Sequence, residues 1–300
     1  MLSKLFFLLG RKLGYDVTPN NFYSPIPDLR ELELEDDVWS KRSKLVGIDI
    51  NEDGQMKLLQ RFQLSYKNEY DKFPINRTAT SHEYFLKNGV FQCIDAEILY
   101  CMIRHFKPRR ILEVGSGNST YLMAQAVAKN REQDCQYACD LVAIDPYPNS
   151  TLQAGFPGLS RLIDQKVQSV PLSEFTALSA DDVLFIDSSH VLKTGSDVQY
   201  EYLEILPRLA KGVIIHIHDI FLPEEYPKGW LLDHHRFWNE QYILQALLSY
   251  NDCFKVLWMA RHMRVTHHDA LAEAFRSYSS LKAEGATWVG PASFWLKKIR

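Results

Sequence analysis

The chain has 300 residues, a composition ordinary for a globular protein and a formal net charge of −3. This length allows one large α/β domain with additions or two domains, and the lack of a basic excess argues against a nucleic-acid partner. Five scattered cysteines without a Cys-x-x-Cys pair argue against a disulfide framework or a zinc knuckle. They indicate reduced thiols and predict a cytoplasmic protein.

The first 83 residues are polar and mixed in charge, and we interpret them as an N-terminal extension or cap with one or two helices. The opening stretch, MLSKLFFLLGRKLGYDV, predicts a short amphipathic helix. A signal peptide is disfavoured because the apolar run is short and no small-residue cleavage site follows it. Contact of Phe6 and Phe7 with a membrane surface stays open, but no stretch approaches the ~20 apolar residues of a membrane span.

Residues 84–300 form the second predicted domain, which starts with a helical pattern that Lys107-Pro108 ends. Apolar strands then alternate with helical segments. The predicted strands are 110–114, 141–145, 161–168, 182–187, 212–219, 254–259 and 292–298, and the predicted helices are 119–129, a short one from 173, 196–210 and 237–249. This alternation is typical of an α/β protein with a parallel sheet covered on both faces.

Two glycines predict a nucleotide loop at the end of the first of these strands. Gly115 and Gly117 directly follow strand 110–114 and precede a helix. In an open α/β sheet, ligands bind outside the carboxyl ends of the strands, and glycine lets the backbone approach them. Asp145 ends the next strand, where a carboxylate can hold both ribose hydroxyls.

Two other residues argue against a dinucleotide. Thr120 stands where a Gly-x-Gly-x-x-Gly loop has its third glycine, and Glu113 would repel a pyrophosphate. An acidic residue suits S-adenosylmethionine, which carries an amino group and a sulfonium and has no phosphate. The alternative for Glu113 is a carboxylate that caps local backbone amides.

At this point the sequence resembles a known family. LEVGSGNST (112–120) is similar to motif I of class I S-adenosylmethionine-dependent methyltransferases, and AIDPYP (143–148) resembles their second-strand acidic motif. DVLFIDSSHV and GVIIHIHDI look like their fourth and fifth strands. The resemblance covers roughly residues 84–260 and is greatest to the subgroup of macrolide-sugar O-methyltransferases and cephalosporin-hydroxylase-like proteins. It implies a Rossmann-like, seven-stranded, mostly parallel sheet whose last strand is antiparallel.

The resemblance also implies a set of cofactor-binding residues. Glu113, Gly115 and Gly117 would surround the methionine part of S-adenosylmethionine, and Asp145 would bind the ribose. Gln168 is a looser match beside the adenine. We further expect Tyr84, from the N-terminal side, to close over the cofactor.

A second group of polar residues ends the strands at the same edge of the sheet. Asp187, His190, His218 and Asp219 all lie at or near carboxyl ends, and buried strands that end in such groups need partners for them. The resemblance implies that Asp187 and a pair at the end of the next strand hold Mg²⁺, with His190 as catalytic base.

His218 stands where the family has a carboxylate. Because imidazole suits Mn²⁺ better than Mg²⁺, the metal, if one is used, stays open. The alternative is that Asp187 only fixes its loop and that His216 and His218 are core histidines.

We therefore predict a methyltransferase that uses S-adenosylmethionine, and in some form a divalent metal, to methylate a hydroxyl of a small glycosyl or secondary-metabolite acceptor. An aromatic-rich insertion around residues 221–240 is expected over the acceptor site. The alternatives are a nicotinamide-dependent oxidoreductase on a Rossmann sheet and a non-catalytic accessory protein that binds S-adenosylmethionine or a metal. Homo-oligomerisation is left open.

Overall fold

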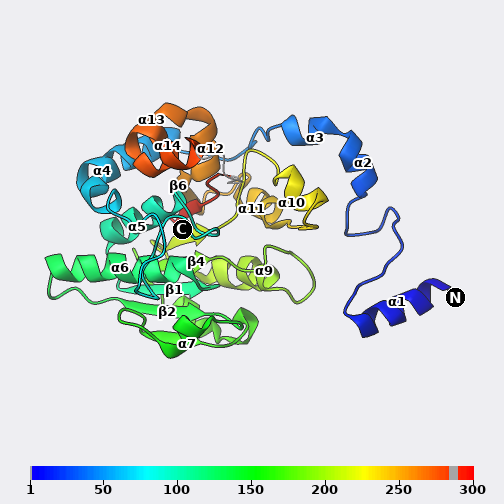
Figure 1. The fold of residues 1–300 in the computed structure, drawn as a ribbon, viewed down its shortest axis with the longest axis horizontal. Helices are drawn as coiled ribbons and strands as arrows, with labels where there is room; N and C mark the ends of the chain where they lie inside the picture. The colour runs from blue at the N-terminus through cyan, green and yellow to red at the C-terminus, as the bar shows by residue number, and fades with distance from the viewer. Residues whose placement is uncertain (1, 284–289) are drawn as a thin grey trace. The chain divides into compact units, whose positions relative to one another are not determined.

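The computed structural model describes residues 2–283 and 290–300, and its ribbon is drawn in Figure 1. The strands are β1 (Arg110–Val114), β2 (Asp140–Ile144), β3 (Arg161–Ile163), β4 (Val183–Ile186), β5 (Ile214–Ile217), β6 (Phe254–Met259) and β7 (Phe294–Lys298). The α-helices are α1 (Leu2–Leu13), α2 (Leu29–Leu34), α3 (Asp36–Ser40), α4 (Glu52–Tyr70), α5 (Asp95–Phe106), α6 (Asn118–Gln133), α7 (Ser150–Ala154), α8 (Leu172–Thr176), α9 (Asp197–Tyr200), α10 (Lys228–Leu232), α11 (Glu240–Leu248), α12 (Ala260–Thr266), α13 (His268–Ala274) and α14 (Arg276–Ala283).

The chain forms two compact units. One consists of Met1–Lys41 and Glu225–Phe237, and the other of Arg42–Glu224 and Trp238–Arg300. These units do not follow the boundary predicted between residues 83 and 84, which stays a prediction. The aromatic insertion predicted around 221–240 is divided between the two units, and its place over an acceptor likewise stays a prediction. The second unit holds the whole sheet.

The sheet has seven strands in the order β3-β2-β1-β4-β5-β7-β6. β7 runs antiparallel to β5 and β6, and the other neighbouring strands are parallel. The predicted fold class, a Rossmann-like and mostly parallel seven-stranded sheet, is confirmed.

Two predicted elements are shorter or less regular than their patterns suggested. The third strand ends at Ile163 instead of 168, and residues Val167–Ser169 form a 3₁₀ turn (η1). The helix predicted at 196–210 continues after α9 as a π-helical segment, η2 (Glu201–Ile205), and a 3₁₀ segment, η3 (Leu206–Arg208). Pro207 lacks an amide hydrogen, so a regular α-helix cannot continue through it.

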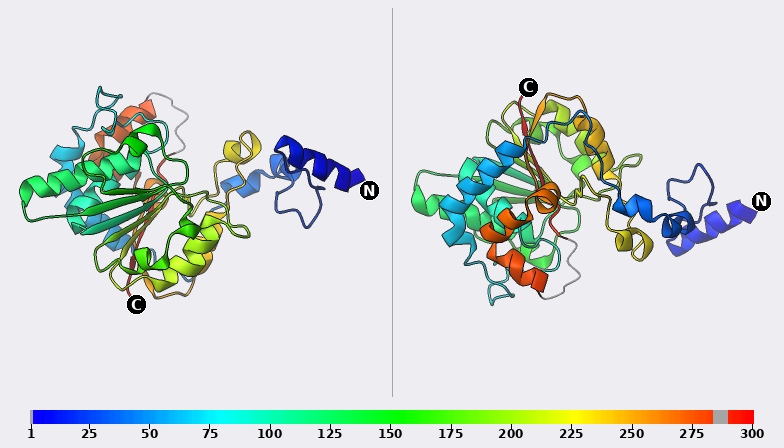
Figure 2. Two further views of the ribbon diagram at one scale, coloured as in Figure 1. Left: turned by 90° about the horizontal axis from the view of Figure 1, so that it is seen from below. Right: turned by 90° about the horizontal axis from the view of Figure 1, so that it is seen from above.

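Alternate residues of the strands pack into two cores, one on each face of the sheet, as Figure 2 shows from two sides. One core takes Ile111, Val183 and Phe185 and packs them against α4, α5, α6 and α13. The other takes Leu112, Leu184 and Ile186 and packs them against α8, α9, η2 and α11. Near-continuous apolar strands are what a parallel sheet buried on both faces requires.

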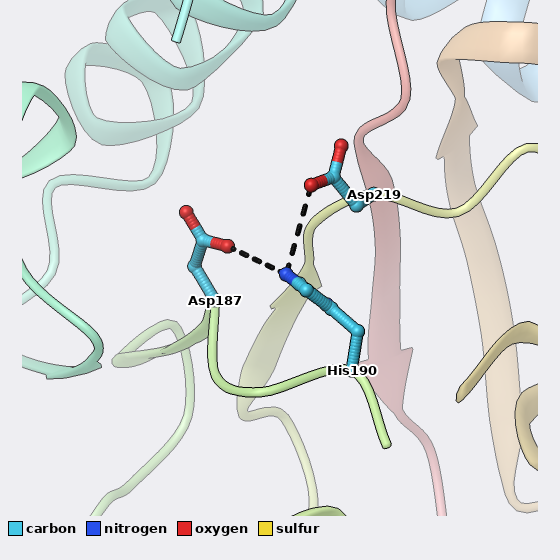
Figure 3. Close-up of side chains that lie close together, drawn as sticks. All are labelled: Asp187, His190 and Asp219. Carbon is cyan, nitrogen blue, oxygen red and sulfur yellow. Dashed lines mark ion pairs between the residues drawn. The ribbon is translucent and has the colours of Figure 1, made fainter. Parts of the chain in front are cut away.

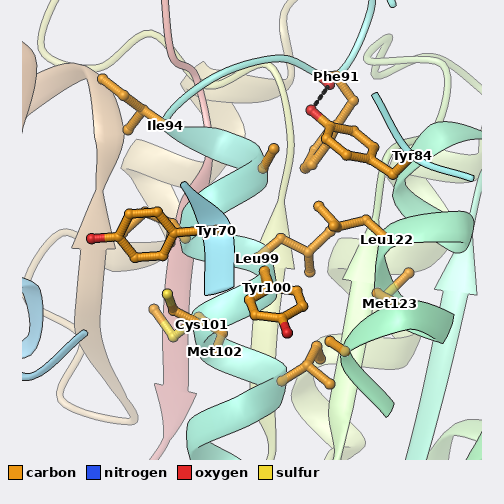
Figure 4. Close-up of a cluster of buried hydrophobic side chains, with 14 of the residues drawn as sticks. Tyr70, Tyr84, Phe91, Ile94, Leu99, Tyr100, Cys101, Met102, Leu122 and Met123 are labelled. Atoms are coloured by element: carbon orange, nitrogen blue, oxygen red, sulfur yellow. Dashed lines mark hydrogen bonds between the residues drawn. The ribbon is translucent and has the colours of Figure 1, made fainter. Parts of the chain in front are cut away.

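The helix α5 is the centre of the first core, as Figure 4 shows. Its residues from Asp95 to Arg104 are all buried. Ile98, Cys101 and Met102, which the helical spacing assigned to one apolar face, lie within this core. The buried helix holds the strands from one side and leaves their carboxyl ends free to carry polar groups.

β1 and β4 are neighbours at the point where the strand order reverses, since β1 continues to β2 on one side and β4 to β5 on the other. Crevices at such a switch point are the usual ligand sites of open α/β sheets. Among residues 2–283 and 290–300, no helix has both the length and the hydropathy that crossing a membrane would need.

Candidate active site

The loop after β1 touches the end of β4 through Gly115. This residue has φ +80°, in the left-handed region, and a Cβ atom there would lie 1.9 Å from the backbone oxygen of Asp187. Only glycine fits such a close approach. Gly117 differs: a Cβ atom there would meet no heavy atom within 4 Å. The protein itself therefore requires glycine at 115, while the space beside Gly117 is open.

A cavity of about 620 Å³ lies at this edge of the sheet. Of the predicted site residues, Gly115, Asp145, Gln168 and Asp187 line it. Lining residues that the sequence patterns did not single out include Ser116, Tyr147, Lys166, Ser189 and Lys193. A volume between ~300 and 1,000 Å³ is typical of small-molecule and cofactor sites.

Asp145 is fixed by the loop that it faces. Its Oδ2 accepts hydrogen bonds from Ser116 N (3.0 Å) and Ser116 Oγ (2.7 Å), and its Oδ1 accepts one from Tyr147 N (2.7 Å). An ionised carboxylate has about four acceptor positions. Asp145 therefore keeps acceptor capacity toward the cavity. Gln168 donates through Nε2 to Gly195 O (3.0 Å), which fixes its amide at the cavity wall.

Glu113 is fully buried and holds the start of α6. Its two carboxylate oxygens accept from Ser119 Oγ (2.5 Å) and Thr120 Oγ1 (2.6 Å). Thr120 Oγ1 in turn accepts from Gly117 N (2.9 Å). The carboxylate thus binds hydroxyls rather than the backbone amides of the alternative interpretation, and it positions the glycine loop through Thr120. Burial raises the pKa of Glu113 to about 8, against the opposing effect of the two hydroxyl hydrogen bonds.

This raised pKa predicts a pH dependence of stability. Between about pH 5.5 and 7.5 the folded protein binds more protons at Glu113 than the unfolded chain, whose carboxyl has its usual pKa near 4.5. The contribution of Glu113 to the free energy of unfolding therefore falls as the pH rises, by about 1 kcal/mol per pH unit. Urea unfolding of the wild type and Glu113→Gln should diverge in favour of the variant with rising pH.

The matched control for this prediction is Glu132→Gln, since the Glu132 side chain is mostly exposed on α6. Its stability curve should stay parallel to that of the wild type. Parallel curves for Glu113→Gln as well would mean that Glu113 titrates normally in the folded protein.

Next to the cavity, His190 lies between two carboxylates, as Figure 3 shows. Its Nε2 is 3.3 Å from Asp187 Oδ1 and 3.6 Å from Asp219 Oδ2. Its Nδ1 is 2.9 Å from Oε2 of the fully buried Glu240, on α11. The imidazole is thus oriented at both nitrogens, a geometry that suits a group exchanging a proton at Nε2.

The backbone at this site is unusual at two residues. His190 has φ +59° and Asp219 has φ +53°, both in the left-handed region. Histidine and aspartate are among the residues that tolerate this region, and such conformations cluster at functional sites. The backbone turn at Asp219 redirects its side chain from the strand direction toward His190.

The charges of this group are strongly coupled. Burial opposes the positive charge of His190, but its hydrogen bonds to Asp187 and Glu240 and the charge of Asp219 outweigh burial and raise the pKa of His190 well above its usual range. For Asp187, burial acts upward, but the charges of His218 and His190 lower its pKa to about 2. Three carboxylates therefore keep this imidazole positively charged at neutral pH.

Asp187, His190 and Asp219 also form a group that could hold a metal ion, because one ligand atom from each lies within 4.8 Å of the others. The sequence had predicted His218 as the third ligand. The structure instead brings His190 to that position, while His218 Nε2 lies 3.8 Å from Asp219 Oδ1. Two carboxylates and an imidazole form a donor set that suits Mn²⁺ and is less typical of Mg²⁺.

His216 and His218 do share one face of β5, but that face is covered by the core. The His216 ring stacks on Phe185 at 3.9 Å, and its Nε2 is 3.1 Å from Ser293 Oγ. The His218 ring lies 4.9 Å from that of Phe91. The interpretation of His216 as a core histidine fits its surroundings, and burial lowers its pKa well below the usual range.

Tyr84 does not reach the cavity. It is fully buried in the core around α5, where its hydroxyl donates to Phe91 O at 2.8 Å and its ring contacts Phe73 (Figure 4). The expectation that it closes over the cofactor is therefore corrected: the apolar core competes for this side chain and holds it.

Glu240 is the residue of this group that the sequence patterns missed. It follows His190 by 50 positions and comes from a helix that begins after the fifth strand, so no spacing rule linked the two. Another buried carboxylate, Glu201, accepts a hydrogen bond from Ser188 Oγ at 3.0 Å and lies in the π-helical segment η2. Short π-helical segments are frequent at functional sites.

Comparison with known proteins gives this edge of the sheet a family. Residues 112–220 match the family model of a methyltransferase domain. An uncharacterized protein of Archaeoglobus fulgidus is 36% identical over 175 residues, which cover 57% of this chain and 77% of the relative.

Among solved structures, the apo structure of CmcI-N160 matches 78% of this chain and 84% of its own with 13% identity and a TM-score of 0.37. A putative protein-L-isoaspartate O-methyltransferase from Plasmodium falciparum in complex with S-adenosyl-L-homocysteine matches 57% of this chain and 85% of its own with 16% identity and a TM-score of 0.33.

The matched region runs from β1 to the end of β5 and so contains the glycine loop, Asp145 and the Asp187–His190–Asp219 group. The sheet order, with its single antiparallel strand β7, is the one that the family resemblance implied. This chain belongs to the class I S-adenosylmethionine-dependent methyltransferases.

Proposed function

We propose that the protein transfers the methyl group of S-adenosylmethionine to a hydroxyl group of a small acceptor, with His190 as the base. The observation that carries this proposal is the orientation of His190. Its Nδ1 is held by Glu240, and its Nε2 faces Asp187, which lines the cavity. A base must lie within reach of the proton that it removes, and this one lies at the cavity wall.

The residues that we propose for S-adenosylmethionine are those on the other side of the same cavity. The open space beside Gly117 would take the methionine part, and the remaining acceptor positions of Asp145 would bind the ribose hydroxyls. Gln168 would lie beside the adenine. Glu113 acts indirectly, as a positioning residue for the loop. The family membership disfavours the nicotinamide alternative.

Proton removal is the step for which the group around His190 is suited. A hydroxyl is a poor nucleophile until its proton leaves, and alignment of the two bound reactants supplies most of the rest. His190 must be neutral before it can accept that proton at Nε2, yet the carboxylates around it favour its charged form. Once His190 has accepted the proton, Glu240 stabilises the imidazolium through Nδ1.

A divalent cation is part of this proposal, since Asp187 and Asp219 could hold it. When bound, it would offset the two carboxylates, make a neutral His190 easier to reach and acidify a coordinated hydroxyl. The glycosyl or secondary-metabolite class of the acceptor rests only on the resemblance of the IDSSH and HD motifs. A small-molecule acceptor and a cytoplasmic location belong to the same proposal.

Metal binding tests this function without relying on turnover alone. We expect calorimetry on the EDTA-treated full chain to detect Mn²⁺ binding at least as tight as Mg²⁺ binding, and Asp187→Asn or Asp219→Asn to weaken it by about tenfold or more. His190→Ala should keep most of the Mn²⁺ affinity if His190 acts as the base, and lose it if His190 is a ligand.

In the same samples, EDTA should reduce transfer of a labelled methyl group to hydroxylated acceptors, and Mn²⁺ should restore it. His218→Ala is the matched histidine control and should leave Mn²⁺ affinity nearly unchanged, since its Nε2 is 3.8 Å from Asp219. Turnover that is insensitive to EDTA, together with no measurable Mn²⁺ binding, would remove the metal from the proposal and leave the base.

A further inference from the structure

We infer that α1 docks the protein on an anionic lipid surface. The helix LSKLFFLLGRKL carries an apolar stripe formed by Leu5, Phe6, Leu9 and Leu13, at spacings that place them on one helix face. All four side chains are more than half exposed, between 52% and 66%. A soluble helix ordinarily buries such a stripe, so this one lacks the covering that its sequence requires.

The apolar exposure is concentrated in this part of the chain. More than half of the exposed large hydrophobic side chains found in the described residues lie between positions 5 and 34, although that segment is about a tenth of the chain. Phe22 and Tyr23, the most exposed of them, pair edge to face. A concentration of this kind marks an interaction surface, whereas scattered exposed apolar residues are ordinary.

The charge of the helix selects the partner. Lys4, Arg11 and Lys12 are its only charged residues, and the first acidic residue of the chain is Asp16. The whole chain has a net charge of −3, so the cationic character is local to this helix. Amphipathic helices with basic residues and exposed Leu and Phe lie in the interface of membranes that contain anionic lipids.

Two other occupants fit less well. A second copy would bring two helices with the same positive charge together, and their charges would repel. A membrane span is too long for this helix, because 12 residues cover only ~18 Å, against a hydrocarbon core of ~30 Å. A helix lying in the plane of an anionic surface satisfies both the apolar stripe and the charge.

Cosedimentation of the full chain with vesicles tests this inference. We expect binding to phosphatidylcholine vesicles that contain about one third phosphatidylglycerol, weak binding to phosphatidylcholine alone, and weakening by salt. Phe6→Ser combined with Leu9→Ser should lower the partition coefficient at least about tenfold. Arg11→Glu combined with Lys12→Glu should abolish the preference for the anionic vesicles. Leu64→Ser, which changes an equally exposed leucine on α4, is the matched control and should bind like the wild type.

Failure of the wild type to bind the anionic vesicles would overturn the inference, and so would an equal loss in the Leu64→Ser control. Sedimentation velocity without lipid separates the remaining occupant. A concentration-dependent dimer that Phe6→Ser and Leu9→Ser abolish, with no vesicle binding by the wild type, would assign the stripe to a second copy of the chain.

Discussion

Replacing His190 by alanine should slow methyl transfer by roughly 10²–10⁴-fold, the usual contribution of a positioned general base. The side chain accepts the proton at Nε2 and is oriented through Nδ1 by Glu240. Affinity for S-adenosylmethionine should change little, because His190 does not line the cavity. Single-turnover rates and calorimetry measure the two quantities separately. Raising the pH should restore part of the lost rate, since solvent can then remove the proton.

Glu240→Gln distinguishes a base from a merely structural histidine. The amide oxygen can still accept a hydrogen bond from Nδ1, but one negative charge beside the imidazole is lost. The pKa of His190 should therefore fall, and the rising limb of the rate against pH should move to lower pH. His268→Ala, a change on the surface helix α13, is the control and should leave both the rate and the profile unchanged.

A His190→Ala enzyme with the rate of the wild type would show that the group around His190 is structural. An unshifted pH profile in Glu240→Gln, combined with a slow His190→Ala, would leave the base in place and remove Glu240 from its positioning.

The regular part of the site could be predicted because its cause is local. β1 and β6 have the predicted bounds, β4 and β5 lie within theirs, and parallel strands bring their carboxyl ends to one edge. Asp187 and Asp219 therefore meet, although 32 residues separate them. The glycine loop followed from the same rule, and its Gly115 makes the contact with Asp187 O that joins β1 to β4.

The rest depends on contacts that the sequence patterns do not encode. Glu240 reaches His190 from α11, and only the packing of that helix against the sheet brings the two together. Tyr84 was expected at the cofactor, but a helix as apolar as α5 draws neighbouring aromatic rings into the core. The period of two placed His218 on one face with His216 correctly, yet could not tell that Phe91 covers that face.

Glu113 is an intermediate case. Motif I predicted an acidic residue at the end of β1 but not its partners. The hydroxyls of Ser119 and Thr120 were visible in the motif itself, six and seven positions later, in the first turn of α6. A helix start places those positions over the strand end. The signal for a positioning role was therefore present, but it competed with a direct role at the ligand.

The strongest effect on cofactor binding is expected at Gly117. Since a Cβ atom there meets no protein atom within 4 Å, a side chain at this position would enter the open space that we assign to the methionine part of S-adenosylmethionine. Gly117→Val should keep the fold and weaken S-adenosylmethionine binding by about a hundredfold or more, which corresponds to about 2.7 kcal/mol. Calorimetry measures the affinity, and thermal unfolding checks the fold.

Gly115→Ala is the matched comparison and should behave in the opposite way. Its Cβ atom would collide with Asp187 O, and its backbone has φ +80°, so the loss should appear first in stability. Asp145→Ala should fall between the two, with stability nearly kept and affinity reduced about tenfold, because a hydrogen bond to a charged group contributes ~1.5–3 kcal/mol. A 2′,3′-dideoxyribose analogue of the cofactor should bind Asp145→Ala and the wild type about equally. If Gly117→Val folds and binds S-adenosylmethionine as the wild type does, then Gly117→Ala should be equally silent, and the cofactor must lie elsewhere in the cavity.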